Sequence, residues 1–368
     1  MCKFQAVMPL VPSYIKKLNS YKPGKPISEV ERELGLNEVI KLASNENPLG
    51  PSPKAKKAIQ DCLLDIHRYP DASGHALREK LAKRYNIKIS NVVLGSGSEG
   101  IMSTIMRTFL LNDDEIISSS NSFIGFKVLA NASGRKIHWV PMKDHRYDLL
   151  KLAHHINDYT KIIYIANPDN PMGTYVTRKE FDAFYKHVPE RVLIILDEAY
   201  FEYANHSNDY PDSMTYRYDN VITLRSFSKA YGLGGVRIGY GFAHSDLISN
   251  LMKVKVPFEP SSLAQAAAFS ALDDKDFLSK SLLLNRDGFE FLTKQFQKLK
   301  VKYIDSVTNF ITTRWDSTEQ AILITQRLLE HGIIVRHLAS FGWPNYVRIS
   351  IGLKEENQKL INCMNKIL

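Results

Sequence analysis

The sequence of 368 residues has few cysteines and no long apolar run, and these absences narrow the class of protein. Its three cysteines are too few and too scattered for a disulfide framework, and no Cys/His spacing indicates a metal site. The purest apolar run, Val192 to Leu196, is far shorter than the roughly 20 residues that cross a bilayer. Prolines interrupt the apolar stretch near the N-terminus, so we expect no signal peptide. These features predict a cytoplasmic protein without metal or membrane contact.

The charge of the chain is positive but dispersed. The formal net charge is +9, and the densest basic cluster, Lys54, Lys56 and Lys57, has the spacing of a solvated helix face. We therefore expect no nucleic-acid partner. Excess lysine favours solubility, and a preference for anionic small molecules also fits this balance.

The length of the chain predicts two unequal domains. The proline content and the pattern of helical and apolar segments suggest where each domain begins and ends. Residues 1–44 are punctuated by prolines and read as an N-terminal arm, residues 45–262 as a large domain, and residues 263–368 as a small α+β domain. In the large domain, helical segments alternate with short apolar runs. Most runs are continuous, which indicates strands covered on both faces. The expected fold is α/β, with a mostly parallel seven-stranded sheet between helices. The seven runs are Val92–Leu94, Glu115–Ser118, Lys136–Val140, Lys161–Ala166, Val192–Leu196, Val221–Leu224 and Val236–Phe242.

Polar motifs follow four of the predicted strands. They are Gly95 to Gly100, Asn167 to Gly173, Asp197 to Tyr200 and Arg225 to Lys229. In an open α/β sheet, ligands bind at the carboxyl ends of the strands. The four motifs therefore predict one pocket.

The glycine-rich motif is ambiguous by itself. Gly95-x-Gly97-x-x-Gly100 matches a dinucleotide fingerprint, which also needs an acidic residue at the end of the next strand. Glu115 has the distance but begins its strand. We interpret the loop as a cradle for one phosphate at a helix N-terminus, with a glycine-rich turn capped by Ser98 as the structural alternative.

The other motifs are also ambiguous when each is taken alone. Ser226-x-x-Lys229 matches a Ser-Lys acyl-transfer motif, but the supporting Lys-Thr-Gly strand is missing. Asp197 could cap a helix, and Asn170 between two prolines could shape a turn.

The order of the motifs along the chain, and the way their chemical groups complement one another, favour a shared function over the separate alternatives. An enzyme that uses pyridoxal 5'-phosphate (PLP) needs an amine, a carboxylate for the pyridine nitrogen, donors to the ring hydroxyl, and a cation with N–H groups for the phosphate. All four appear here, in the order Asn-Pro-x-Asn-Pro-x-Gly, Asp-Glu-Ala-Tyr, Ser-x-Ser-Lys and Arg237. This order resembles the fold type I PLP-transferases, specifically the aminotransferases.

Further motifs resemble the histidinol-phosphate aminotransferases and span residues 12 to 352. They are Tyr21-Lys-Pro-Gly-Lys-Pro26, Lys41-Leu-Ala-Ser-Asn-Glu-Asn-Pro-Leu-Gly50, Arg68-Tyr-Pro-Asp71 and Val347-Arg-Ile-Ser-Ile-Gly352. The chain departs from the family where Met172 replaces the usual Thr and where Asp169 replaces the common Asn. It departs again where Asn121-Ser122-Phe123 replaces Pro-Thr-aromatic. None of these changes removes a required chemical group.

The resemblance implies roles around the cofactor. Lys229 would carry PLP as a Schiff base and later move the proton between substrate and cofactor, and Asp197 would pair with the pyridine nitrogen. Asn170 and Tyr200 would hydrogen-bond the ring oxygen, while Phe123 would stack on the ring. The implied phosphate-binding residues are Gly97, Ser98, Glu99, Ser226, Ser228 and Arg237.

The resemblance also implies an obligate homodimer, because Tyr69 would reach the phosphate from the partner subunit; a surface tyrosine before a turn is the alternative. Arg348 would clamp the glutamate α-carboxylate, and Arg336 with Tyr21 would receive the phosphate of histidinol phosphate. Surface ion pairs are the competing explanation for both arginines. Asn45 is a further candidate substrate-binding residue.

The implied activity is amino-group transfer between histidinol phosphate and 2-oxoglutarate/glutamate, in histidine biosynthesis. An aromatic amino-acid aminotransferase or a phospho-amino-acid decarboxylase on the same scaffold is the first alternative. A non-catalytic PLP-fold domain used for sensing is the second.

Overall fold

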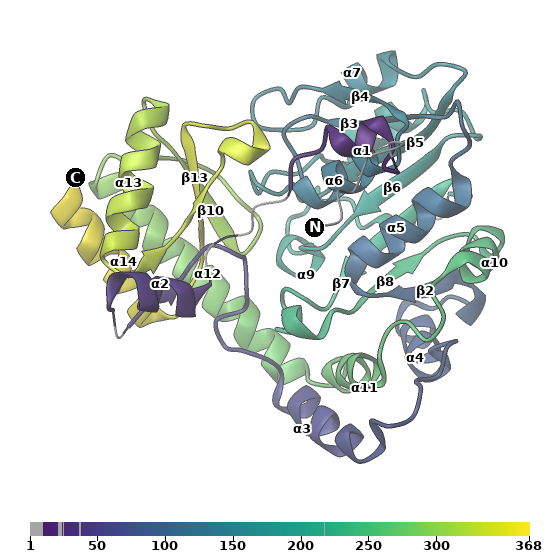
Figure 1. Ribbon diagram of the computed structural model, residues 1–368, viewed down its shortest axis with the longest axis horizontal. Coiled ribbons are helices and arrows are strands. Elements are labelled where there is room, and N and C mark those ends of the chain that lie inside the picture. Colours follow the sequence, from purple (N-terminus) through teal and green to yellow (C-terminus); the bar gives the residue numbers. More distant parts are fainter. Residues whose placement is uncertain (1–9, 21–23, 25, 37, 217) are drawn as a thin grey trace, which may run out of the picture.

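The structure is a computed structural model that describes residues 10–20, 24, 26–36, 38–216 and 218–368. These residues form a large layered part around a seven-stranded sheet and a smaller part around a four-stranded sheet (Figure 1). No helix within the described ranges combines the length and the apolar character needed to cross a membrane.

The large sheet has the strand order β2-β8-β7-β6-β5-β3-β4. Strand β8 is antiparallel to both of its neighbours, and all other adjacent pairs are parallel. The expected α/β fold with a mostly parallel sheet is thus confirmed. The strands are β2 (Val92–Gly95), β3 (Glu115–Ser119), β4 (Lys136–Val140), β5 (Thr160–Ala166), β6 (Leu193–Asp197), β7 (Val221–Ser226) and β8 (Gly239–Phe242).

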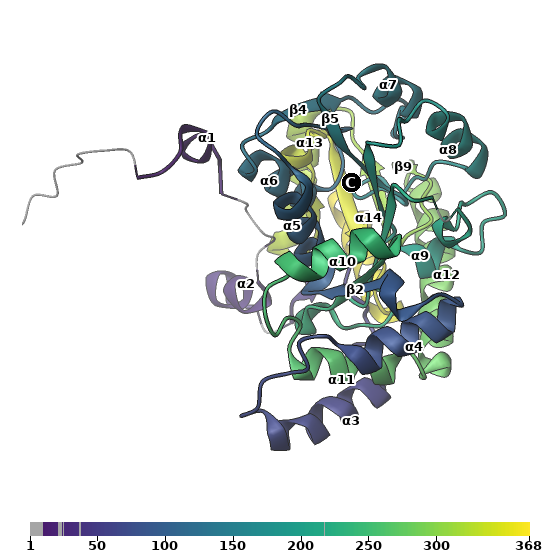
Figure 2. The same cartoon turned by 90° about the vertical axis from the view of Figure 1, so that its right-hand side faces the viewer.

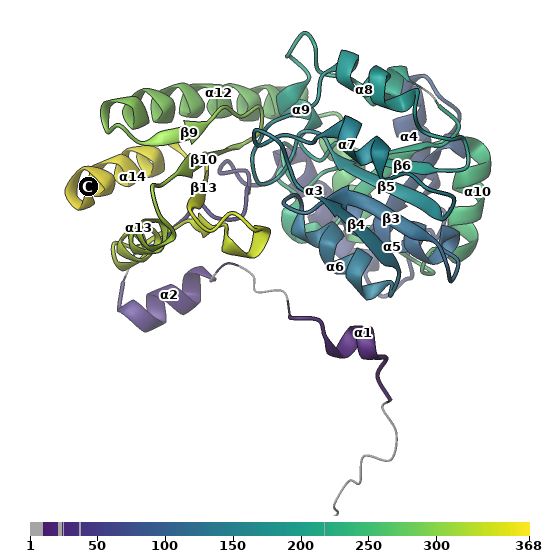
Figure 3. The ribbon, with the colours of Figure 1, turned by 90° about the horizontal axis from the view of Figure 1, so that it is seen from above.

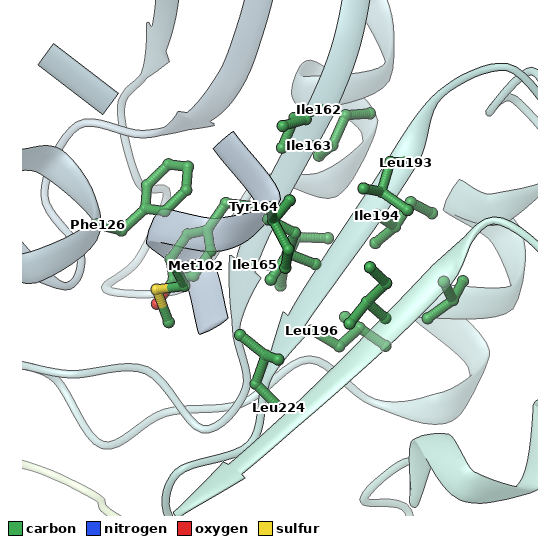
Figure 4. Close-up of a cluster of buried hydrophobic side chains, with 14 of the residues drawn as sticks. Met102, Phe126, Ile162, Ile163, Tyr164, Ile165, Leu193, Ile194, Leu196 and Leu224 are labelled. Carbon is green, nitrogen blue, oxygen red and sulfur yellow. The ribbon is translucent and has the colours of Figure 1, made fainter. Parts of the chain in front are cut away.

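Helices cover both faces of this sheet, with α5, α6 and α10 on one side and α7 and α8 on the other (Figures 2 and 3). This explains why the central strands are apolar without alternation, since both sets of side chains are buried. In the core, the ring of Tyr164 stacks on that of Phe126 at 3.8 Å, among isoleucines of β5 and β6 (Figure 4). The helices of this part are α3 (Pro53–Cys62), α4 (His75–Tyr85), α5 (Gly97–Phe109), α6 (Ile124–Ala132), α7 (Leu149–His154), α8 (Arg178–Tyr185), α9 (Phe201–Ala204), α10 (Ser245–Val254) and α11 (Ser262–Ala271).

The smaller part contains an antiparallel sheet in the order β12-β13-β10-β9. The long helix α12 runs from the large part to this sheet, which α13 and α14 also cover (Figure 1). The elements are α12 (Lys275–Lys298), β9 (Lys302–Ile304), β10 (Phe310–Arg314), α13 (Thr318–Glu330), β11 (Ile333–Ile334), β12 (Arg336–His337), β13 (Tyr346–Ser350) and α14 (Lys354–Ile367).

The N-terminal elements contact both the large part and the smaller part, and α11 packs within the large part. Helix α1 (Ser13–Lys16) lies beside α6, and α2 (Ile27–Leu34) lies beside the smaller part (Figure 1). Strand β1 (Ile40–Lys41) pairs with β11, and α11 packs against α3 and α4. The domain limits at residues 44 and 262 stay predictions.

One predicted strand begins later than expected. The run Val236–Phe242 was expected to be extended throughout, but residues 234–236 form a 3-10 turn and Arg237 has a φ of 60°. The strand β8 starts only at Gly239. A hydrophobic run cannot reveal that Arg237 leaves the strand direction to reach the pocket described next.

Candidate active site

A pocket of about 190 Å³ lies at the carboxyl ends of β5, β6 and β7, beside the N-terminus of α5. It brings together every predicted cofactor-binding residue except Tyr69. The remaining lining residues are small or apolar. The lining residues are Gly97, Ser98, Glu99, Phe123, Ala166, Pro168, Asn170, Asp197, Ala199, Tyr200, Ser226, Ser228, Lys229 and Arg237.

Asp197, the last residue of β6, has one satisfied and one unsatisfied carboxylate oxygen. Its Oδ2 accepts a hydrogen bond from the Tyr164 hydroxyl at 2.8 Å. Its buried Oδ1 has no hydrogen-bond partner among the described residues. Burial raises the pKa of Asp197 to about 7, because desolvation penalises the charged carboxylate more than the hydrogen bond from Tyr164 stabilises it. The pocket therefore presents a carboxylate suited to a cationic N–H donor.

Lys229 and Tyr200 lie together in the pocket, with the Lys229 ammonium 5.6 Å from the centre of the Tyr200 ring. The Tyr200 oxygen accepts a hydrogen bond from the Asn45 amide at 2.8 Å. Asn45 is itself oriented by two hydrogen bonds with Ser350. Since Asn45 occupies an acceptor site of the Tyr200 hydroxyl, the hydroxyl proton can be donated into the pocket.

Asn170 is oriented by an arginine from the smaller part. Arg348 Nη1 donates to the Asn170 side-chain oxygen, and Arg348 Nη2 donates to the Ala43 carbonyl at 2.8 Å. With its oxygen taken by Arg348, Asn170 has its amide nitrogen as the donor toward a ligand. Arg348 lies directly opposite Arg336 in the β12–β13 pair, so two cations are adjacent near the pocket.

The opposite end of the pocket is built for an anion. Gly97 has a φ of 75°, and a Cβ added there would lie 2.6 Å from Arg237 Nη2. Arg237 Nη1 lies 3.4 Å from the Ser228 hydroxyl, and Nη2 lies 3.5 Å from Glu99. The first residues of α5, Gly97 to Glu99, line the pocket together with this arginine. Backbone N–H groups, hydroxyls and a guanidinium form a suitable cradle for a phosphate.

Sequence and structure comparisons agree with this geometry. Residues 37–363 match the model of the family "Aminotransferase class I and II". The chain belongs to this aminotransferase family. Histidinol-phosphate aminotransferase 1 of Nitrosococcus oceani is 42% identical over 96% of this chain and 95% of that protein, and the Caldicellulosiruptor saccharolyticus enzyme is 41% identical over 96% and 99%. These full-length relatives place the aminotransferase in the histidinol-phosphate group.

Solved structures show the same architecture. The histidinol-phosphate aminotransferase of Sinorhizobium meliloti, solved in complex with pyridoxal 5'-phosphate, has a TM-score of 0.90, 28% identity and 98% coverage of both chains. An aspartate aminotransferase of Thermus thermophilus, at 19% identity and a TM-score of 0.83, shares the fold. The protein is therefore a transaminase of fold type I, within a PLP-dependent family.

Four predicted residues that the structure describes do not line the pocket: Asn45 and Arg348, which reach it through Tyr200 and Asn170, and Tyr69 and Arg336. Tyr69 is 81% exposed, and its ring stacks on Phe258 with centroids 4.4 Å apart. Arg336 is half-buried, with its guanidinium 5.9 Å from the Phe341 ring. Tyr21 lies outside the described residues.

The sequence did not reveal two features of the site. Tyr164 lies within β5, and its hydroxyl donates a hydrogen bond to Asp197. In the sequence, the only indication of this role is one hydroxyl-bearing residue within an otherwise apolar strand. Ser122 and Asp169 form a buried hydrogen-bonded pair behind the pocket. Their signal was the departure of both positions from the family pattern.

Proposed function

We propose that this aminotransferase binds PLP in the described pocket and transfers an amino group between histidinol phosphate and 2-oxoglutarate/glutamate. The observation that carries the cofactor assignment is the buried Asp197 Oδ1 without a partner. A pyridine nitrogen carrying a proton would supply the missing donor and the positive charge. The substrate assignment draws on the relatives named above and on the adjacent Arg336 and Arg348.

The residues of the pocket fit the cofactor from end to end. Bound PLP supplies an electron sink for the bond that breaks at the substrate α-carbon. Asp197 would hold the proton on the ring nitrogen, and Asn170 and Tyr200 would donate to the ring oxygen. Phe123 would lie against the ring. Lys229 would supply the amine that condenses with the cofactor aldehyde, with loss of water, and that later moves the proton at the substrate α-carbon.

The phosphate end anchors the cofactor. The N–H groups of Gly97, Ser98 and Glu99 and the hydroxyls of Ser226 and Ser228 would surround the phosphate, and Arg237 would neutralise it. Because Glu99 is within 3.5 Å of Arg237, we expect the phosphate to compete with this carboxylate for the guanidinium.

Two arginines supply the substrate contacts. Arg348 would hold the α-carboxylate by a bidentate pair, and Arg336 with Tyr21 would hold the phosphate of the alcohol substrate. Asn45 would act on the substrate side through the hydroxyl of Tyr200.

The proposal includes a homodimer in the cytoplasm. Between α3 and Tyr69 the chain exposes several large apolar side chains, including Leu64 at 83% and Ile66 at 57%. A contiguous exposed apolar stretch of this kind is typical of a protein interface. Tyr69 would then be buried by, and contribute to, the partner's pocket.

Purified holoenzyme tests the proposal. It should be yellow, and borohydride should fix the cofactor to the Lys229 peptide; Lys229→Ala should abolish both fixation and transfer. Initial rates with histidinol phosphate and with phenylalanine, each with 2-oxoglutarate, then test the substrate. A preference for phenylalanine, or release of CO₂ in place of amino transfer, would replace the substrate assignment. A protein that binds no PLP would refute the cofactor assignment.

A further inference from the structure

Ser122 and Asp169 are the central members of a buried hydrogen-bond chain next to the pocket. The Tyr147 hydroxyl donates to Ser122 Oγ at 2.7 Å, and Ser122 Oγ donates to Asp169 Oδ1 at 2.5 Å. The Met172 N–H donates to the second oxygen, Oδ2, at 3.0 Å. The Tyr147 oxygen accepts from the Ala166 N–H at 3.2 Å. Both carboxylate oxygens therefore act as acceptors, although burial raises the pKa of Asp169 to about 7.

The chain joins loops that come from three neighbouring strands. Ser122 follows β3, Tyr147 follows β4, and Asp169 follows β5, and these strands are adjacent in the sheet. Ser122 and Asp169 are both almost fully buried, at 4% and 1% exposure. The O–H···O distance of 2.5 Å lies at the short end of the range for a hydroxyl that donates to a carboxyl oxygen.

Each member of the pair immediately precedes a residue of the pocket. Ser122 precedes Phe123, and Asp169 precedes Asn170. Asn170 is held from its other side by Arg348. Neither member of the pair lines the pocket, and their hydrogen bonds are made with buried groups, so their effect on a ligand passes through Phe123 and Asn170.

We infer that Ser122 and Asp169 are a positioning pair: their hydrogen bond sets the separation between Phe123 and Asn170, and thereby the fit of the cofactor ring. The inference rests on the proposed function, since it assigns the ring to the space between these two residues. Phe123 would lose its place over the ring when the Ser122 hydroxyl is removed. Asn170 would lose its place at the ring oxygen when residue 169 cannot accept at both positions.

Four single variants separate positioning from general core damage. Ser122→Ala removes the donor. Asp169→Asn keeps the shape but places an NH₂ group against either the Ser122 hydroxyl or the Met172 N–H. Ser122→Thr keeps the hydroxyl. Ser213→Ala is the matched control, because Ser213 is also 4% exposed and its hydroxyl bonds Thr223 at 2.7 Å, away from the pocket.

The measurements are made on the holoenzyme. We expect Ser122→Ala and Asp169→Asn each to weaken PLP binding about 5-fold, the effect of losing one net hydrogen bond. Both should raise the pH at which the bound cofactor changes colour, because a donor to the ring oxygen is displaced. The double variant should lose no more than the worse single variant, since the two residues act as one unit. Ser122→Thr and Ser213→Ala should match wild type.

The experiment distinguishes a failure of the positioning role from a failure of the proposed function. A wild-type protein without PLP would refute the proposed function itself. A yellow wild type whose Ser122→Ala and Asp169→Asn variants keep its PLP affinity and its colour transition would overturn the positioning role alone. Equal loss in Ser213→Ala would also overturn it, because any buried hydroxyl would then have the same effect. Thermal unfolding of each variant identifies the temperature at which all are folded for this comparison.

Discussion

Replacing Asp197 by Asn should stabilise the cofactor-free chain while it weakens PLP binding. Burial raises the pKa of Asp197 from 3.8 to about 7. At 1.36 kcal/mol per unit, ionising this group in the folded state costs at most about 4 kcal/mol. An amide carries no charge and can still accept from Tyr164. The apo variant should therefore exceed wild type in stability at pH 8 by up to that amount.

The pH dependence has a defined sign. The folded chain holds the Asp197 proton more tightly than the unfolded chain does, so wild type loses stability as the pH rises from about 4 to about 7. The contribution is constant above that range. The difference in the free energy of unfolding between Asp197→Asn and wild type should thus be near zero at pH 4 and largest above pH 7. Denaturant unfolding of both apoproteins at each pH measures it.

Binding should move in the opposite direction. Asp197→Asn loses a charge-assisted hydrogen bond to the ring nitrogen, so its PLP dissociation constant should rise about 10- to 100-fold. Glu202→Gln is the matched control. Both Glu202 carboxylate oxygens are buried without a partner among the described residues, burial raises its pKa to about 7, and it does not line the pocket.

Glu202→Gln should also remove a pH-dependent loss of stability but leave PLP affinity within 2-fold of wild type. Parallel unfolding curves for wild type and Asp197→Asn across this pH range would refute the idea that the pocket holds an uncompensated carboxylate. A loss of PLP affinity in Glu202→Gln equal to that in Asp197→Asn would refute the claim that the effect is local to the ring nitrogen.

Three further predictions concern Tyr164 behind Asp197, the buried ion pair of Arg225, and Arg336. Tyr164→Phe removes a donor to Asp197 and should weaken PLP binding about 3- to 10-fold by titration, since one hydrogen bond is lost; an unchanged affinity would contradict this. Arg225→Met leaves Glu198 buried and unpaired and should cost about 3–5 kcal/mol by denaturant unfolding, whereas a loss under 1 kcal/mol would contradict the buried ion pair. Arg336→Ala should raise the KM for histidinol phosphate more than that for glutamate, and equal increases would remove its proposed role.

The sequence predicted the layers of the fold because its strands are buried on both faces. A continuous run such as the one in β5 can only be stable between two layers of helices, so the α/β sheet follows from composition and spacing. The pairing of β1 with β11 could not be predicted, since two-residue strands far apart in the sequence carry no periodic signal. The left-handed backbone conformation of Arg237 could not be predicted either, because a hydrophobic run gives no information on the φ angle of one residue.

The pocket residues were predictable where a motif placed them directly after a strand. Asp197 ends β6 and Lys229 follows β7, and the parallel pairing of these two strands brings both residues to the same edge of the sheet. Side chains that act from behind the pocket were not predictable in this way. Tyr164 lies inside a strand, and the partner of Ser122 lies on another loop, so only the three-dimensional arrangement connects them.

Two neighbouring carboxylates at the end of β6, Asp197 and Glu198, have different partners and different roles. Asp197 and the next residue, Glu198, point to opposite faces, as successive residues of an extended chain do. On the face away from the pocket, Glu198 pairs with the fully buried Arg225, which also pairs with Asp212 at 2.8 Å. Arg225 precedes Ser226, a pocket residue. The ion pair thus joins the end of β6 to β7 directly beside Asp197 and Ser226. The strand ends that carry these two pocket residues are therefore held in a fixed position by charges on the other face of the sheet.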